Sequence, residues 1–154
     1  MRRLVPFLTA AWVIAVVASV TFVIASSYPP VREARARPGK TGSLEALVNG
    51  VREKAGKPAL RDSGELDSLA AGRCRDLEAS GTMSHAGFQP MFDSQSVFNS
   101  MGENLAEDYP DESGAVAGWV ESPKHYADMT GSWEWTGTAE CGRYYVQLFA
   151  NFQA

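Results

Sequence analysis

The carboxyl-terminal stretch WTGTAECGRYYVQLFANF, residues 135–152, decides the class of fold. Trp135 to Glu140 and Tyr144 to Phe152 are rich in aromatic and β-branched residues, and they flank Cys141 and Gly142. This composition is typical of two strands joined by a tight turn, so we expect a β-hairpin here. The periodic apolar segments before it have helical spacing. Helices first and strands last predict an α+β domain.

Three amphipathic helices and one short helical turn are predicted upstream of the hairpin. In the first helix, apolar residues recur at positions i, i+3, i+4 and i+7. In the second, Asp62 and Glu65 have the spacing of a capping box. Residues 86–100 are rich in Gly, Pro, Ser and Asn and are predicted as an irregular loop. The predicted starts are Ser43, Asp62 or Ser63, Asp111 and, for the turn, Pro123, and the three helices end before Gly56, at Gly81 and at Glu121.

The amino terminus differs in composition from the rest of the chain. Leu4 to Ala25 contains no charged residue and is long enough for a helix that crosses a bilayer. We expect it to be a retained membrane anchor, with a signal peptide cleaved near Ala25 as the alternative. The next segment is rich in Pro and Arg and reads as a linker. The predicted parts are therefore an anchor or signal at 1–26, a linker at 27–42 and a folded domain at 43–154.

The composition of the folded part excludes some functions. A chain of roughly 110 residues is near the commonest domain size and can bury one core without a dense disulfide framework. The net charge of −4 is mild and is spread along the chain. No basic patch suited to nucleic acid is visible. We expect a monomeric domain that does not bind nucleic acid.

The chain has only two histidines, His85 and His125, and each lies in a turn-like segment. Glu103 lies between a glycine and an apolar pair in MGENLA, residues 101–106. Taken singly, each of these residues is more often a surface or structural side chain than a member of a functional site. The sequence has no His-Glu-x-x-His helix and no Gly-x-Ser-x-Gly turn, so the motifs of zinc peptidases and of α/β-hydrolases are absent.

Taken together, short pieces of residues 43–154 resemble the compact bacterial branch of the CAP superfamily, which is named for cysteine-rich secretory proteins, antigen 5 and pathogenesis-related 1 proteins. Each piece is weak alone, but six in the right order are specific. The pieces are Asn49 with Arg52, Pro58-Ala59-Leu60 with the helix start at Leu66 to Ala71, Ser84-His85, Gly102-Glu103-Asn104-Leu105-Ala106, Trp119 with Ser122-Pro123 and His125, and Tyr145-Val146-Gln147-Leu148-Phe149-Ala150.

The resemblance implies a three-layer α-β-α sandwich with a small, mainly antiparallel sheet. It also implies a central cleft lined by His85, Glu103 and His125. A second acidic position of the eukaryotic members falls on Ser122 here. The nearest acid, Glu121, is one residue early on a helix, which turns it by ~100°.

Two imidazoles and a carboxylate can hold zinc or a similar divalent cation while leaving a position open. The resemblance thus predicts a metal site of His85, Glu103 and His125, with Glu121 at the cleft, in a binding module for a lipid or peptide. One alternative is a hydrolase in which Glu103 is the general base for a metal-bound water. Another is a structural or adhesive surface protein with a vestigial cleft. No residue is assigned a catalytic role, because no group that would position a substrate or stabilise an oxyanion is identifiable.

The two cysteines, Cys74 on the core face of the second helix and Cys141 at the hairpin turn, are predicted to pair. We expect the domain outside the cytoplasm, anchored in the cell membrane by residues 4–25 or secreted after cleavage, and cysteines in such a compartment are more often paired than free. The sequence leaves two free thiols open as the alternative, because it does not give the distance between the two residues.

Overall fold

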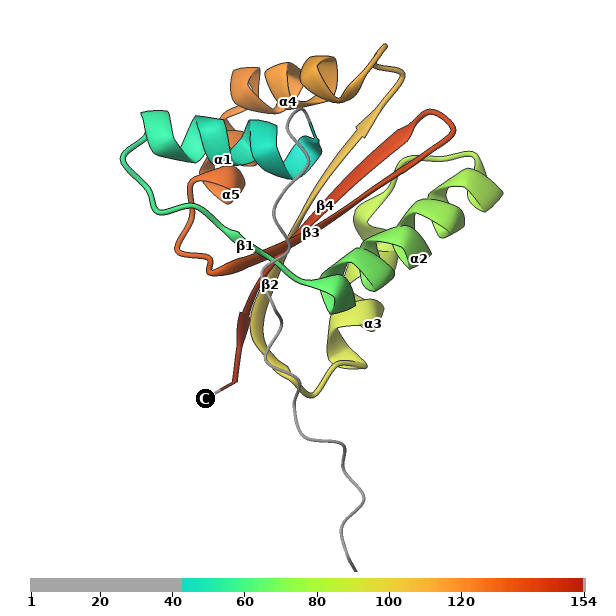
Figure 1. The fold of residues 1–154 in the computed structure, drawn as a ribbon. Helices are drawn as coiled ribbons and strands as arrows, with labels where there is room; N and C mark the ends of the chain where they lie inside the picture. Colours follow the sequence, from blue (N-terminus) through green and yellow to red (C-terminus); the bar gives the residue numbers. More distant parts are fainter. Residues whose placement is uncertain (1–42, 154) are drawn as a thin grey trace, which may run out of the picture. The chain divides into compact units, whose positions relative to one another are not determined.

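The structure is a computed structural model, and it describes residues 43–153 (Figure 1). The predicted anchor or signal at 1–26 and the linker at 27–42 lie outside these residues and stay predictions. Among residues 43–153, no helix is both long enough and apolar enough to cross a membrane.

A four-stranded sheet forms the centre of the domain, in the order β1-β3-β4-β2. The long strands pair antiparallel, and only the two-residue strand β1 runs parallel to its neighbour. The predicted hairpin is confirmed as β3 and β4. Strand β2 lies at an edge of the sheet and has β4 as its one neighbour there. The bounds are Arg61–Asp62 for β1, Phe98–Glu107 for β2, Trp135–Cys141 for β3 and Tyr144–Phe152 for β4.

Helices cover both faces of the sheet, which confirms the predicted three-layer α-β-α sandwich (Figure 1). Helices α1, α4 and α5 lie on one side, and α2 and α3 lie on the other. The bounds are Leu44–Lys54 for α1, Gly64–Ser80 for α2, Phe88–Asp93 for α3, Glu112–Glu121 for α4 and Pro123–Met129 for α5, with a 3-10 turn, η1, at His85–Gly87.

Each face of the sheet has its own apolar core. On the side of α1, α4 and α5, Val48 and Trp119 pack with Phe149. On the side of α2, Leu66 packs with Leu148. Because successive strand residues point to opposite faces, adjacent positions of β4 supply both cores. The two helical layers are thus held to one sheet by the same strand.

Side chains cap the starts of the three long helices. Ser43, Ser63 and Asp111 each accept a hydrogen bond from a backbone N–H three residues later. The expected capping box of Asp62 and Glu65 is wrong, because Asp62 belongs to β1 and Ser63 supplies the cap. Helix α2 ends as predicted at Gly81, whose φ of 65° favours glycine.

The prediction of an irregular loop at residues 86–100 is only partly right. Its first part forms η1 and α3, and its last residues begin strand β2. The prediction missed β2 because Asn99, Gly102 and Asn104 lie within it, and these residue types are depleted in strands. Tertiary pairing with β4 decides its conformation instead.

Helix α2 packs directly on the backbone of β3 at Gly137. A Cβ atom at this position would overlap the backbone of Leu66 and Asp67 in the first turn of α2. The absence of a side chain therefore allows the helix to approach the strand closely.

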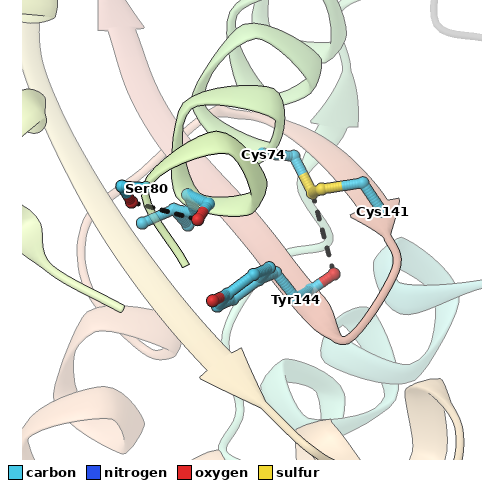
Figure 2. The surroundings of a disulfide bond; sticks show 5 residues. Cys74, Ser80, Cys141 and Tyr144 are labelled. Atoms are coloured by element: carbon cyan, nitrogen blue, oxygen red, sulfur yellow. Dashed lines mark hydrogen bonds between the residues drawn. A yellow bond between two sulfur atoms is a disulfide. The ribbon is translucent and has the colours of Figure 1, made fainter. Parts of the chain in front are cut away.

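A disulfide bond joins the second half of α2 to the hairpin (Figure 2). The Cα atoms of Cys74 and Cys141 are 5.9 Å apart, and 67 positions separate the two residues in the chain. The carbonyl oxygen of Tyr144 lies 3.7 Å from Sγ of Cys74. The predicted pairing is confirmed, and α2 is fastened to the sheet at Gly137 and at Cys141.

The carboxyl group of Glu45 makes stability depend on pH. Burial, followed by the negative charges of Asp62 and Asp67, raises its pKa from 4.5 to about 7. The folded state therefore holds this proton more strongly than the unfolded state. The resulting stabilisation is complete below pH 4.5 and is lost as the pH rises through about 7.

We expect Glu45→Gln to raise the free energy of unfolding above pH 7 by about 1 kcal/mol, a figure kept small by solvent screening. Near pH 4.5 the two proteins should unfold alike. Denaturant titrations at the two pH values measure this difference.

Candidate functional site

The candidate site lies along the edge strand β2, where side chains from both helical layers meet. Glu103 and Asn104 are consecutive in this strand, so their side chains point to opposite faces. Glu103 contacts α2 and η1, and Asn104 contacts α5. One peptide unit of β2 therefore reaches both of the elements that carry the histidines.

Glu103 forms a buried ion pair with Arg73 of α2. The side chains of Arg73 and Glu103 are 4% and 1% exposed. Arg73 Nε donates to Oε1 of Glu103 at 2.7 Å, and Nη2 donates to Oε2 at 3.4 Å. A carboxylate buried this deeply needs such a cation, because burying an unpaired charge is very costly.

The same carboxylate also holds the ring of His85. Oε2 of Glu103 lies 2.8 Å from Nδ1 of His85. An ionised carboxylate only accepts hydrogen bonds, so in the neutral imidazole the proton lies on Nδ1 and the lone pair lies on Nε2. The His85 side chain is 47% exposed. The carboxylate therefore fixes a half-exposed imidazole with one ring nitrogen available to a ligand.

His125 is held through its backbone rather than through its ring. The side-chain amide of Asn104 donates to the carbonyl oxygen of His125 at 3.2 Å. Burial lowers the pKa of His125, and the nearby positive charge of His85 lowers it further, while Asp128 opposes the shift. His125 therefore stays neutral, the form that binds metal, to lower pH than an ordinary histidine.

The divalent cation that the resemblance implies would need several ligating side chains that converge on one point. Within residues 43–153, no group of three or more His, Cys, Asp and Glu side chains is placed to hold a metal ion. Both oxygens of Glu103 are already engaged by Arg73 and His85. The expected ligand set of two histidines and Glu103 is thus not assembled. The oxygens of Glu103 that the resemblance assigns to a cation are instead used within the protein, by the guanidinium of Arg73 and by Nδ1 of His85.

Glu121, which was expected at the cleft, lines a different concavity. Together with Val116 and Val120 of α4 it faces Leu47 and Val51 of α1 across a groove between the two helices. In the part of the chain that the structure describes, Glu121 makes no hydrogen bond or ion pair with His85, Glu103 or His125. Its off-register position on α4 explains this placement.

Arg73 is the residue of the site that the sequence predictions missed. The signal was its position in α2, since Leu66, Ala70, Arg73 and Leu77 recur at helical spacing and are all buried. A charged residue in the apolar row of a helix needs a buried partner of opposite charge. This spacing is visible in the sequence, but it does not identify the acidic residue that pairs with Arg73.

The fold and this site place the chain in a known family. Residues 45–146 match CAP, the Cysteine-rich secretory protein family, and the chain belongs to this family. No curated protein matches the chain significantly.

Solved bacterial structures share the fold at low sequence identity. An extracellular protein containing an SCP domain from Bacillus anthracis is 22% identical, with a TM-score of 0.65 over 70% of this chain and 38% of that one. An outer surface protein from Borrelia burgdorferi is 20% identical, with a TM-score of 0.65 over 71% of this chain and 90% of that one. A cysteine-rich secretory protein from Staphylococcus aureus is 17% identical, with a TM-score of 0.63 over 70% of this chain and 36% of that one. The chain thus spans less than half of the Bacillus and Staphylococcus proteins.

Proposed function

We propose that this CAP domain is an extracytoplasmic binding module whose cleft takes a divalent cation such as zinc, together with a lipid or peptide ligand. His85, through Nε2, and His125 are the two metal ligands. The other coordination positions are left to water or to the bound ligand. A cation held in this way supplies a positive charge to which an oxygen atom of the ligand binds.

Two observations support a location outside the cytoplasm. The first is the bond between Cys74 and Cys141, since disulfides persist in oxidising compartments and are rare in the cytosol. The second is that the three similar structures are described as extracellular, outer surface and secretory proteins. With the apolar segment at Leu4 to Ala25, these observations favour export, with the domain tethered to the membrane or released from it.

The contacts of Glu103 are the observation that favours binding over hydrolysis. A general base needs an oxygen within reach of the proton that it removes. The two oxygens of Glu103 are instead engaged by Arg73 and by Nδ1 of His85, and the side chain is 1% exposed. A buried carboxylate that accepts from the non-ligating nitrogen of a histidine is the usual outer partner of a metal ligand.

Zinc titration of the full chain, produced without a histidine tag, tests this proposal. We expect binding at pH 7.5, and we expect His85→Ala and His125→Ala each to weaken it by at least about tenfold, since each removes one of two protein ligands. Glu121→Ala is the matched control and should bind like the original protein, because Glu121 lines the groove between α1 and α4. Isothermal titration calorimetry measures the affinities, and circular dichroism shows that each variant is folded. Unchanged zinc affinity in either histidine variant would contradict the shared site.

A further inference from the structure

We propose that Arg73 is a positioning residue of the cleft, which orients Glu103 and the η1 turn so that His85 presents Nε2 to a ligand. The orientation of the ring is a property of the chain itself. The use of Nε2 as a metal ligand rests on the proposed function.

The first link in this arrangement is the pairing of a planar guanidinium with a carboxylate. Arg73 contacts both oxygens of Glu103, through Nε at 2.7 Å and through Nη2 at 3.4 Å. Such a two-point contact fixes the plane of the carboxylate as well as its position. Oε2 is thereby directed at Nδ1 of His85, 2.8 Å away.

The second link joins Arg73 to the backbone that carries His85. Nη2 of Arg73 donates to the carbonyl oxygen of Ser84 at 2.7 Å. The hydroxyl of Ser84 in turn accepts from the backbone N–H of Ala86 and caps η1. Arg73 thus holds the acceptor of the imidazole proton and also the turn from which the imidazole projects.

The third link is the space that Gly87 leaves for the guanidinium. A Cβ atom at Gly87 would lie 2.8 Å from Nη1 of Arg73 and 3.3 Å from its Cζ. Any side chain at this position would therefore press on the guanidinium. The absence of a side chain at Gly87 therefore lets the η1 turn pack against Arg73 of α2, the residue that binds Glu103.

Stability alone does not account for this buried pair. Well-packed apolar residues of similar volume often replace a buried ion pair with no loss of stability, or with a gain. Here the pair has two further partners, the half-exposed ring of His85 and the backbone carbonyl oxygen of Ser84. Without the guanidinium, Glu103 would lose the partner of its buried charge, and nothing would fix the plane of the carboxylate with Oε2 directed at Nδ1.

Nitrogen NMR of the full chain labelled with 15N-histidine tests the inference directly. The chain has two histidines, so an untagged sample gives only two ring systems. Without metal and at pH 8, we expect the ring nitrogens of His85 to show a proton on Nδ1. In Arg73→Met the proton should move predominantly to Nε2, the tautomer that a free histidine side chain prefers. Arg73→Lys keeps the charge without the two-point contact and should give a mixture.

His125 is the internal control, because Arg73 makes no hydrogen bond to it or to Asn104 among the described residues. Its ring spectrum should be the same in all three proteins. If Arg73→Met does not fold, Gly87→Ala presses on the guanidinium without removing it, and it should shift the His85 tautomer in the same direction by a smaller amount. A His85 ring that keeps its proton on Nδ1 in a folded Arg73→Met or Gly87→Ala protein overturns the inference.

Zinc titration of the same variants separates this inference from the proposed function. If both are right, Arg73→Met weakens zinc binding by about 10–100-fold, as is typical for the loss of an outer-sphere partner. If the His85 tautomer shifts but the original protein binds no zinc, the positioning role stands and the metal site fails. If zinc binds equally well to both proteins and the tautomer does not move, the positioning role fails and the metal site stands.

Discussion

Gly137→Ala is expected to lower the free energy of unfolding by more than about 3 kcal/mol, a loss typical of severe backbone or core overlap. The added methyl group would meet the backbone of Leu66 and Asp67, which cannot rotate aside as a flexible side chain does. Relief requires α2 to move away from β3, and that movement would open the apolar core around Leu66 and Leu148. A domain of this size has a total stability of roughly 5–15 kcal/mol, so the variant should be marginally stable or unfolded at 37 °C.

Gly50→Ala is the matched control, because it makes the same chemical change in the middle of α1. Apart from its chain neighbours and the backbone of α1 itself, a Cβ atom at Gly50 meets no atom within 4 Å. Alanine is a better helix former than glycine, so this variant should gain up to about 1 kcal/mol. Denaturant titration of the two proteins should thus give changes of opposite sign. Similar small changes in both would show that α2 does not lie against β3 as described.

Removal of the disulfide is expected to have the other large effect. In the chain-entropy model, a bond closing a loop of 67 positions stabilises a domain by about 4 kcal/mol through restriction of the unfolded chain. We expect a protein carrying both Cys74→Ala and Cys141→Ala to lose stability of this order in denaturant titration. The original protein treated with a reductant should approach the same value.

Thiol counting gives an independent check of this prediction. Protein taken from an oxidising compartment and unfolded without a reductant should show no alkylatable thiol in mass spectrometry. Two alkylatable thiols per chain would show that Cys74 and Cys141 are not joined. If no thiol is alkylated and the double variant is as stable as the original, the bond forms but contributes little to stability.

The sequence predicted the elements with strong local signals. The hairpin at residues 135–152 and the helix starting at Ser43 have clear periodicity and clear ends, and both are confirmed. Strand β2 was missed because its conformation depends on pairing with β4, which local composition does not report. The small strand β1 was missed for the same reason, since it has two residues and one neighbour.

The candidate site was predictable to a similar extent. Histidines and a glutamate at the positions of a family motif could be named from the sequence, and the structure joins Glu103 to His85 directly. The role of Glu103 could not be predicted from the sequence, because it depends on the contact with Arg73 of α2. The family motif around Glu103 also does not distinguish a metal ligand from the partner of a ligand.

The placement of Glu103 and Asn104 on opposite faces of one strand makes the site depend on strand register. A slip of one residue in the pairing of β2 with β4 would exchange the two side chains between faces. The amide would then face Arg73, and the carboxylate would face the backbone carbonyl of His125, which cannot donate a hydrogen bond to it. The alternative register would therefore lose the contacts to both histidine elements at once. Selection for the cleft is thus also selection against misregistered pairing, at an edge strand where register is otherwise easiest to lose.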